Sequence, residues 1–347
     1  MQYFDYSRLV WHGEQWAAVL PPGGRDFERL PHALLLSGGG GLGKRIFAHQ
    51  LAALMLCESA EPERQLACGQ CQACIWLREG NHPDFRRLSS SEDDADDEKE
   101  TEAKEKKKGA AQIKIGAVRD LEDFVFVGSH RHGSRVVVVE EAHTMNAPAA
   151  NAILKILEEP PASVYFIMTS SRSKLLLPTI RSRCRTLTFK APGKTEWLAA
   201  AKQIGLPESA VPGLALSGGA PLTVLEWQQN GLLDALEAIS RSLGGGAKDP
   251  LTLASTWEGL IRRHAKLDME LLVEQVLRFV FDAALGSVAG RQRYEPTEKA
   301  RVAPNTATNH WADLLRLRGS ARHPLNPTLF LEDLATQTLR ALRPQPA

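Results

Sequence analysis

Short apolar runs alternate with segments of helical periodicity over the first 190 residues. Apolar runs predict buried strands at Ala33–Ser37, Val136–Val139 and Val164–Met168, and a last strand is expected near Thr186–Phe189. Asn81–Leu88 is typical of a turn that leads into a further strand. Helices are expected between them, at Lys44 to about Leu56, from Ile113 onward with Val118, Leu121, Phe124 and Val125 at helical spacing, and at Asn146–Glu159. Such alternation predicts a doubly wound parallel sheet with helices on both faces, which binds its ligand at the carboxyl ends of the strands.

The pattern changes after Pro192, where the β-branched runs disappear. Residues 193–242 and 250–340 have helical character, and Gly244–Gly246 is the evident linker between them. We therefore expect three domains: an α/β domain at 1–192, a small helical domain at 193–244 and a larger helical domain at 245–347.

Composition places few further limits on function. Among the 347 residues, 43% are hydrophobic and 24% are charged, as in ordinary globular proteins. The net charge of +1 gives no overall attraction to nucleic acid, so any DNA contact must come from local patches. No apolar run has membrane-spanning length and no secretory signal precedes the first strand, so we expect a cytoplasmic protein with no membrane partner.

One segment, at about 89–112, combines acids with lysines and almost no residue suited to a core. Glu92–Glu98 is acidic, and Lys104–Lys108 is basic. Such a segment buries too little apolar surface to order itself, so a solvated, disordered insertion is predicted. A lysine tail that contacts DNA is the alternative.

The most specific chemical signal is a phosphate-binding loop between the first strand and its helix. Gly38 to Gly43-Lys44 has the spacing G-x-x-x-x-G-K, in which backbone N–H groups, the helix N-terminus and a lysine surround phosphate oxygens. The hydroxyl residue that should follow the lysine and bind Mg²⁺ is replaced by Arg45. The loop therefore lacks a metal ligand that hydrolysis needs.

Two acids end the most apolar strand. Glu140 and Glu141 follow Val136–Val139, where phosphate-loop proteins place ligands for Mg²⁺ and for the attacking water. The alternative is a charged strand end without a chemical role.

Four of the five cysteines lie within eighteen residues: Cys57, Cys68, Cys71 and Cys74. Their spacing predicts a tetrahedral Zn²⁺ site, and four thiolates leave no open position, so the metal would be structural. An iron–sulfur cluster and uncommitted thiols are the alternatives. Cys184 stands alone and is expected to be a small buried side chain.

These motifs occur together in an order that resembles the bacterial clamp-loader subunits of the AAA+ superfamily. The motifs that carry the resemblance are the loop, the four cysteines after its helix, Asn151–Pro161, Ser182–Cys184 and His323–Glu332 near the C-terminus. The resemblance implies an AAA+ domain with an inserted zinc module, a helical lid and a C-terminal helical collar used for oligomerisation.

Three departures distinguish this chain from the motor subunits of that family. Arg45 stands where motors keep Ser or Thr, Glu140 where they keep Asp, and Leu222 where the lid carries a phosphate-sensing arginine. The resemblance therefore implies a non-motor member without ATPase or polymerase activity of its own. Lys44 is retained, which leaves ATP or ADP binding open.

The resemblance also assigns roles to two residues near the end of the α/β domain. Arg183, within Ser182–Cys184, resembles the arginine that clamp-loader subunits present to ATP on a neighbour, and Thr169 stands where a phosphate sensor is found. The alternative for Arg183 is a solvated basic edge shared with Arg181 and Arg185, or contact with DNA phosphates.

Three functions remain under consideration. The first is a scaffold subunit that joins the motor and delta subunits in a hetero-pentameric ring and helps load a sliding clamp on primed DNA. The second is a self-sufficient ATPase that uses Lys44, Glu140 and Glu141. The third is a zinc-bearing nucleic-acid adaptor outside any complex.

Overall fold

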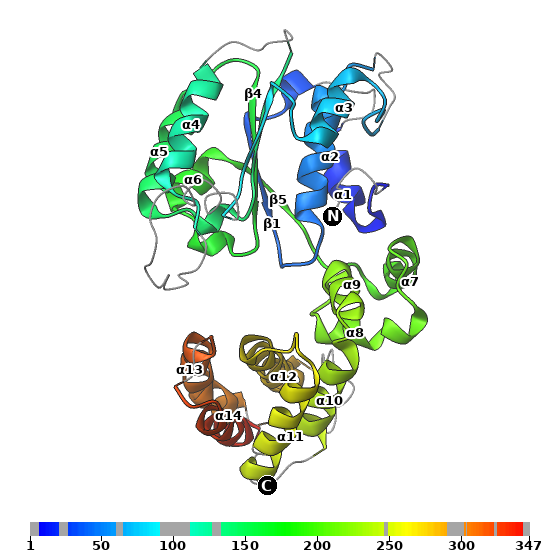
Figure 1. The fold of residues 1–347 in the computed structure, drawn as a ribbon, viewed down its shortest axis with the longest axis vertical. Helices are drawn as coiled ribbons and strands as arrows, with labels where there is room; N and C mark the ends of the chain where they lie inside the picture. The colour runs from blue at the N-terminus through cyan, green and yellow to red at the C-terminus, as the bar shows by residue number, and fades with distance from the viewer. Residues whose placement is uncertain are drawn as a thin grey trace, which may run out of the picture. The chain divides into compact units, whose positions relative to one another are not determined.

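The computed structural model describes residues 7–20, 27–59, 65–90, 112–126, 133–245, 249–289, 302, 304–322 and 325–342. The chain forms two compact units, Met1–Ala200 and Ala201–Ala347 (Figure 1). The predicted insertion at about 89–112 lies outside the described residues, apart from its two ends. The further division of the helical part near residue 244 stays a prediction.

A five-stranded parallel sheet organises the first unit. Its strands are β1 (Ala33–Ser37), β2 (Phe85–Leu88), β3 (Arg135–Val139), β4 (Val164–Ser170) and β5 (Arg185–Thr188). Their order across the sheet is β2-β3-β4-β1-β5, so β1 lies between β4 and β5. In this register Leu36 is opposite Thr169 on one side and Leu187 on the other. The carboxyl ends of β1, β3 and β4 therefore meet at one edge.

Helices cover both faces of this sheet, which explains why its three central strands, β1, β3 and β4, are so apolar. Figure 1 shows α2 (Lys44–Leu56) on one face and α4 (Ile115–Phe126), α5 (Ala147–Glu158) and α6 (Pro178–Arg183) on the other. Every residue of β3 is buried. Burial of each Val or Leu side chain contributes about 1.5–3 kcal/mol, so the covered sheet is the main source of stability in this unit. The predicted α/β fold class is confirmed.

The remaining elements of the first unit flank the sheet. They are η1 (Val10–His12), α1 (Gly13–Val19), η2 (Phe27–Arg29), α3 (Gln72–Glu79), η4 (Ala142–Thr144), η5 (Ser173–Leu175) and α7 (Lys194–Gln203), which crosses into the second unit. Asn146 caps the N-terminus of α5, because its side chain accepts a hydrogen bond from the Ala149 N–H at 2.9 Å.

The second unit is built from helices. They are η6 (Glu208–Ala210), α8 (Pro212–Leu216), α9 (Pro221–Gln229), α10 (Leu233–Gly244), α11 (Pro250–Arg263), α12 (Met269–Ala289), α13 (Pro304–Ser320) and α14 (Pro327–Ala341). Trp257 on α11 is fully buried, and its indole N–H donates to the Ser242 hydroxyl at 3.2 Å. Within the described part of the chain, no helix combines the length and apolar character needed to span a membrane.

Candidate functional site

The loop between β1 and α2 has the backbone geometry that its glycines permit. Gly43 ends the loop at φ 87°, a left-handed conformation that side chains disfavour. A Cβ at Gly38 would lie 2.4 Å from the Phe189 carbonyl oxygen, so only glycine fits there. Lys44 begins α2, is buried, and its Nζ donates to the Gly39 carbonyl oxygen at 2.6 Å. The lysine thus bonds to its own loop.

An N-terminal segment supports the loop from behind. The Trp11 indole N–H donates to the Leu42 carbonyl oxygen at 3.0 Å, and His12 Nε2 lies 2.7 Å from the same oxygen. His12 is fully buried, and this burial lowers its pKa to about 4, although the bond to Leu42 opposes the shift. Because a carbonyl only accepts, the neutral ring carries its hydrogen on Nε2.

Arg45 and Glu140 meet, although 95 positions separate them in the chain. Glu140 is buried at the end of β3; its Oε2 forms an ion pair with Arg45 Nη2, and its Oε1 lies 2.7 Å from His49 Nε2. Arg45 and His49 are one turn apart on α2, so their side chains leave the same helix face. Both carboxylate oxygens of Glu140 are therefore engaged by protein groups.

The electrostatics of Glu140 follow from these contacts. Burial alone would raise the pKa of this carboxyl, but the hydrogen bond from His49 and the charges of Arg45 and Arg87 outweigh it, and the net pKa is lowered. The ionised carboxylate is thus satisfied by a cation that belongs to the protein. In motor loops, a hydroxyl after the lysine and an acid at the strand end share Mg²⁺; here an arginine and an acid pair directly.

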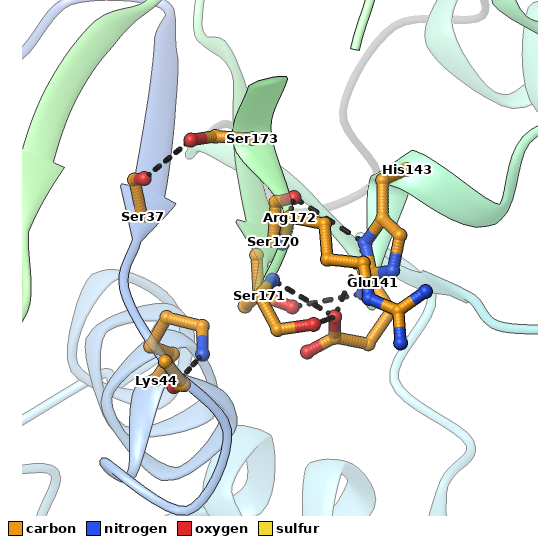
Figure 2. A network of polar contacts seen from close by, with 10 residues as sticks. Ser37, Lys44, Glu141, His143, Ser170, Ser171, Arg172 and Ser173 are labelled. Atoms are coloured by element: carbon orange, nitrogen blue, oxygen red, sulfur yellow. Dashed lines mark hydrogen bonds and ion pairs between the residues drawn. The ribbon is translucent and has the colours of Figure 1, made fainter. Parts of the chain in front are cut away.

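Glu141 occupies the next position and is held in a different direction. It has φ 47°, and its N–H donates to Thr169 Oγ1 at 2.9 Å. Its Oε2 accepts from the Ser171 N–H at 2.9 Å and from the Ser171 hydroxyl at 2.7 Å, and it lies 3.2 Å from His143 Nδ1. Figure 2 shows Glu141, His143 and Ser171 at the end of β4, with Lys44 nearby at the start of α2.

The charges around Glu141 act on one another. Burial lowers the pKa of Lys44, and the carboxylate of Glu141 opposes that shift. Burial also lowers the pKa of His143, and the positive charges of Arg172 and Lys44 add to the effect while Glu141 opposes it. The charged groups of the loop and of the strand ends therefore influence one another's pKa values. The predicted loop, acid and sensor residues (Gly38, Gly43, Lys44, Arg45, Glu140, Glu141 and Thr169) come together at one edge of the sheet.

Arg183 belongs to a separate place. It ends α6, on the face of the sheet opposite α2 (Figure 1). Its Nη1 donates to the Thr179 carbonyl oxygen at 3.0 Å, and its Nη2 pairs with Glu158 Oε1 at 2.6 Å. Arg183 and the phosphate-binding loop of its own chain therefore belong to helices on opposite faces of the sheet.

The four cysteines form a compact cluster between α2 and α3. Their Sγ atoms, from Cys57, Cys68, Cys71 and Cys74, all lie within 4.8 Å of one another. The Cys57–Cys71 and Cys68–Cys74 pairs are 4.0 and 3.9 Å apart, close to the ~3.8 Å that four Zn–S bonds of ~2.3 Å require in a tetrahedron. The donor set and its spacing therefore fit a closed four-thiolate metal site.

Backbone N–H groups support that cluster. The N–H groups of Gln70 and Cys71 point at Cys68 Sγ at 3.5 and 3.3 Å, and the Cys68 N–H points at Cys57 Sγ at 3.3 Å. Although burial would raise the pKa of Cys68, the N–H groups of Gln70 and Cys71 and the thiols of Cys71 and Cys57 lower it to about 6. Burial and the neighbouring cysteines raise the pKa of Cys74, so without a metal the cluster does not ionise as a whole. Burial raises the pKa of Cys184 to about 12, as expected for an inert thiol.

Sequence reasoning missed three residues of these sites: His49, Ser171 and Glu158. A signal for His49 existed, because it follows Arg45 by four positions on a helix and must share its face. Ser171 and Glu158 had no comparable signal, since each meets its partner through a tertiary contact between segments 25 or 30 residues apart.

Comparisons with known proteins point to subunits of DNA polymerase III. The family described as "DNA polymerase III, delta subunit" matches residues 26–193. The DNA polymerase III subunit delta′ of Pseudomonas aeruginosa is 36% identical over 256 residues, which are 72% of this chain and 71% of that protein. The delta′ subunit of Escherichia coli is 30% identical over 243 residues, 66% of each chain.

A similar solved structure is a DNA polymerase III gamma subunit-related protein of Thermotoga maritima. It is 18% identical, has a TM-score of 0.45, and the match covers 90% of this chain and 96% of that one. The level and extent of identity to the curated relatives decide the assignment: this chain belongs to the family of DNA polymerase III delta′ subunits.

Proposed function

We propose that this chain is a non-motor clamp-loader subunit that hydrolyses no ATP itself and completes the active site of a neighbouring ATPase subunit. As a delta′ subunit, it acts with the other clamp-loader subunits of DNA polymerase III. The finer arrangement in this proposal is a cytoplasmic hetero-pentameric ring with motor and delta subunits, which places a sliding clamp on primed DNA. The observation that carries the proposal is the ion pair between Arg45 and Glu140.

The argument against intrinsic hydrolysis is electrostatic. Phosphoryl transfer depends on a divalent cation that neutralises charge between the β- and γ-phosphates. At the strand end, Glu140 has one oxygen on Arg45 and the other on His49, so a divalent cation would have to compete with at least one of these groups to bind the carboxylate. Glu141 is tied to Ser171 and His143, and Lys44 to Gly39. These contacts support the proposal that the groups which would bind Mg²⁺ and phosphate are instead bonded to one another within the protein.

The argument for action on a neighbour concerns Arg183. It lies at the end of α6, on the face of the sheet opposite α2, and its side chain is about one third exposed. An arginine supplied by a neighbouring chain stabilises the charge of the phosphoryl-transfer transition state by roughly 10³–10⁵ in rate. Arg183 can therefore act on ATP bound by a neighbouring subunit even though its own chain hydrolyses none.

The four-cysteine cluster completes the proposal with a structural Zn²⁺. Cys57, Cys68, Cys71 and Cys74 would hold the metal with four thiolates and no open position. When bound, the metal fixes the segment between α2 and α3 and takes no part in hydrolysis.

The deciding experiment uses the reconstituted clamp loader with primed DNA. Arg183→Ala should leave the complex assembled but lower its DNA-stimulated ATP hydrolysis at least about tenfold, because the transition state loses a cation. Arg181→Ala is the matched control, an exposed arginine on the same helix, and should remain within about twofold of wild type. Full activity of Arg183→Ala would contradict the role in trans.

The retained Lys44 and Glu141 favour a second candidate, a self-sufficient ATPase. Under that function the isolated chain should show Mg²⁺-dependent ATP turnover that disappears in Glu141→Gln. Under our proposal the isolated chain shows none. Arg45→Thr alone should not restore turnover, because Leu222 still stands where the motor subunits carry a phosphate-sensing arginine.

A further inference from the structure

Glu158 forms an ion pair with Arg183, and the sequence did not predict this contact. It is the last residue of α5, and Arg183 is the last residue of α6. The contact joins Arg183 Nη2 to Glu158 Oε1 at 2.6 Å. The two helix ends thus converge on one guanidinium.

Both helix ends are anchored firmly in the core. On α5, Ile156 and Leu157 directly precede Glu158 and are each 1% exposed. On α6, Ile180 is fully buried, in the same apolar cluster as those two residues. The backbone positions of Glu158 and Arg183 are therefore fixed relative to each other, and only their side chains reach the surface.

The pair contributes little to stability. Glu158 and Arg183 have side chains that are 50% and 34% exposed, and ion pairs so open to solvent are screened and weak. The ion pair instead orients the arginine. An arginine side chain has many rotamers, and the hydrogen bonds from Arg183 to Glu158 and to the Thr179 carbonyl oxygen define the plane of its guanidinium.

The hydrogen bonds to Thr179 and Glu158 do not use all the N–H donors of the Arg183 guanidinium. A guanidinium has five N–H donors in a rigid fork, and the contacts with Thr179 and Glu158 use one donor from each terminal nitrogen. The remaining donors can meet a phosphoryl oxygen without breaking either contact. An arginine that is already oriented loses less entropy when ATP on the neighbour reaches its transition state.

We propose that Glu158 is a positioning residue that holds Arg183 in the orientation needed to act on ATP bound by a neighbouring subunit. This inference rests on the proposed role of Arg183 in trans. Glu158 contacts no substrate; it acts through the arginine. Its removal therefore changes the rate of the chemical step in the complex and leaves the affinity of the neighbour for ATP unchanged.

The test measures kcat and KM for ATP in the reconstituted, DNA-stimulated complex. Glu158→Gln should lower kcat about threefold to tenfold with KM within about twofold, as for an interaction made only in the transition state. Glu158→Asp, which keeps the charge on a shorter side chain, should recover part of the loss. The matched control is Glu159→Gln, the adjacent exposed acid, which should behave as wild type.

A double variant separates positioning from a general structural effect. In the Arg183→Ala background, Glu158→Gln should cause no further loss, because its effect passes through the arginine. The melting temperature of the isolated chain should be unchanged by Glu158→Gln. An equal loss in both backgrounds, or a rate at or above wild type for Glu158→Gln, would overturn the inference.

The two proposals fail in distinguishable ways. If Arg183→Ala alone leaves hydrolysis at the wild-type rate, the role in trans is wrong and the positioning role of Glu158 is wrong with it. If Arg183→Ala is impaired while Glu158→Gln is not, only the positioning role is wrong.

Discussion

Arg45 shows how a single substitution changes the chemistry of a phosphate loop. In place of a hydroxyl that would share Mg²⁺ with the strand-end acid, it brings a guanidinium that pairs with Glu140 directly. His49 takes the other carboxylate oxygen, so the buried charge remains fully compensated. The acid that pairs with Mg²⁺ in motor loops thus pairs with an arginine of the same chain here.

At the scale of single residues, the sequence predicted which positions are chemically unusual but not which charged groups pair with one another. Arg45 and Glu140 could be identified as departures because each lies in a motif of fixed spacing. Their contact could not be predicted, since it depends on how α2 packs over the end of β3. Thr169 was expected to sense phosphate, and its hydroxyl accepts the Glu141 N–H; its sensing role stays a prediction.

The burial of His12 predicts a specific pH dependence of folding. Its pKa is about 4 in the folded chain and about 6.5 when exposed. Below pH 6.5 the unfolded chain takes up a proton that the folded chain does not, so stability falls as pH drops from 6.5 to 4. The loss attributable to this residue approaches roughly 3 kcal/mol.

The measurement is urea unfolding at pH 7 and pH 4 for wild type and His12→Gln. The glutamine keeps an N–H donor for the Leu42 carbonyl oxygen but does not titrate. Its free energy of unfolding should therefore fall less than that of wild type over this interval. Equal losses in the two proteins would contradict the assignment of a depressed pKa to His12.

Among the elements, those bounded by strong local signals were the most predictable. Strand β1 and helix α2 have the bounds expected from the sequence, because an apolar run, a glycine loop and an amphipathic segment follow directly on one another. Helix α6 was not predicted. It has six residues, begins at Pro178 and is stabilised through buried Ile180, so packing rather than periodicity specifies it. Helix α3 was likewise hidden within the cysteine spacing.

The cysteine cluster gives a prediction about a metal-stabilised element. Cys71→Ser should lower the zinc content of the purified chain from about one per molecule and reduce its melting temperature, because a structural site loses one of four ligands. Metal analysis and thermal unfolding provide the measurements. Cys184→Ser is the control for metal content, since this thiol donates to the Ile180 carbonyl oxygen away from the cluster. Unchanged zinc in Cys71→Ser would exclude the site.

For the whole molecule, the sequence separated an α/β part from a helical part by the loss of β-branched runs after Pro192. The structure divides near the same place, at Ala200 and Ala201, within helix α7. Hydrophobic periodicity reports local structure, so it located this change well. It could not specify how helices far apart in sequence, such as α11 and α14, pack together in the second unit.

The division into two units predicts that folding and assembly can be separated. Residues 1–192 contain the sheet, its covering helices and the cysteine cluster, so this fragment should bind zinc and unfold cooperatively. If oligomerisation depends on the helical collar, the fragment should not co-purify with the other clamp-loader subunits, whereas residues 193–347 should. A complex assembled with 193–347 lacks Arg183 and should hydrolyse ATP as slowly as one with full-length Arg183→Ala. Co-purification of 1–192 at wild-type yield would instead locate the assembly surface on the α/β unit.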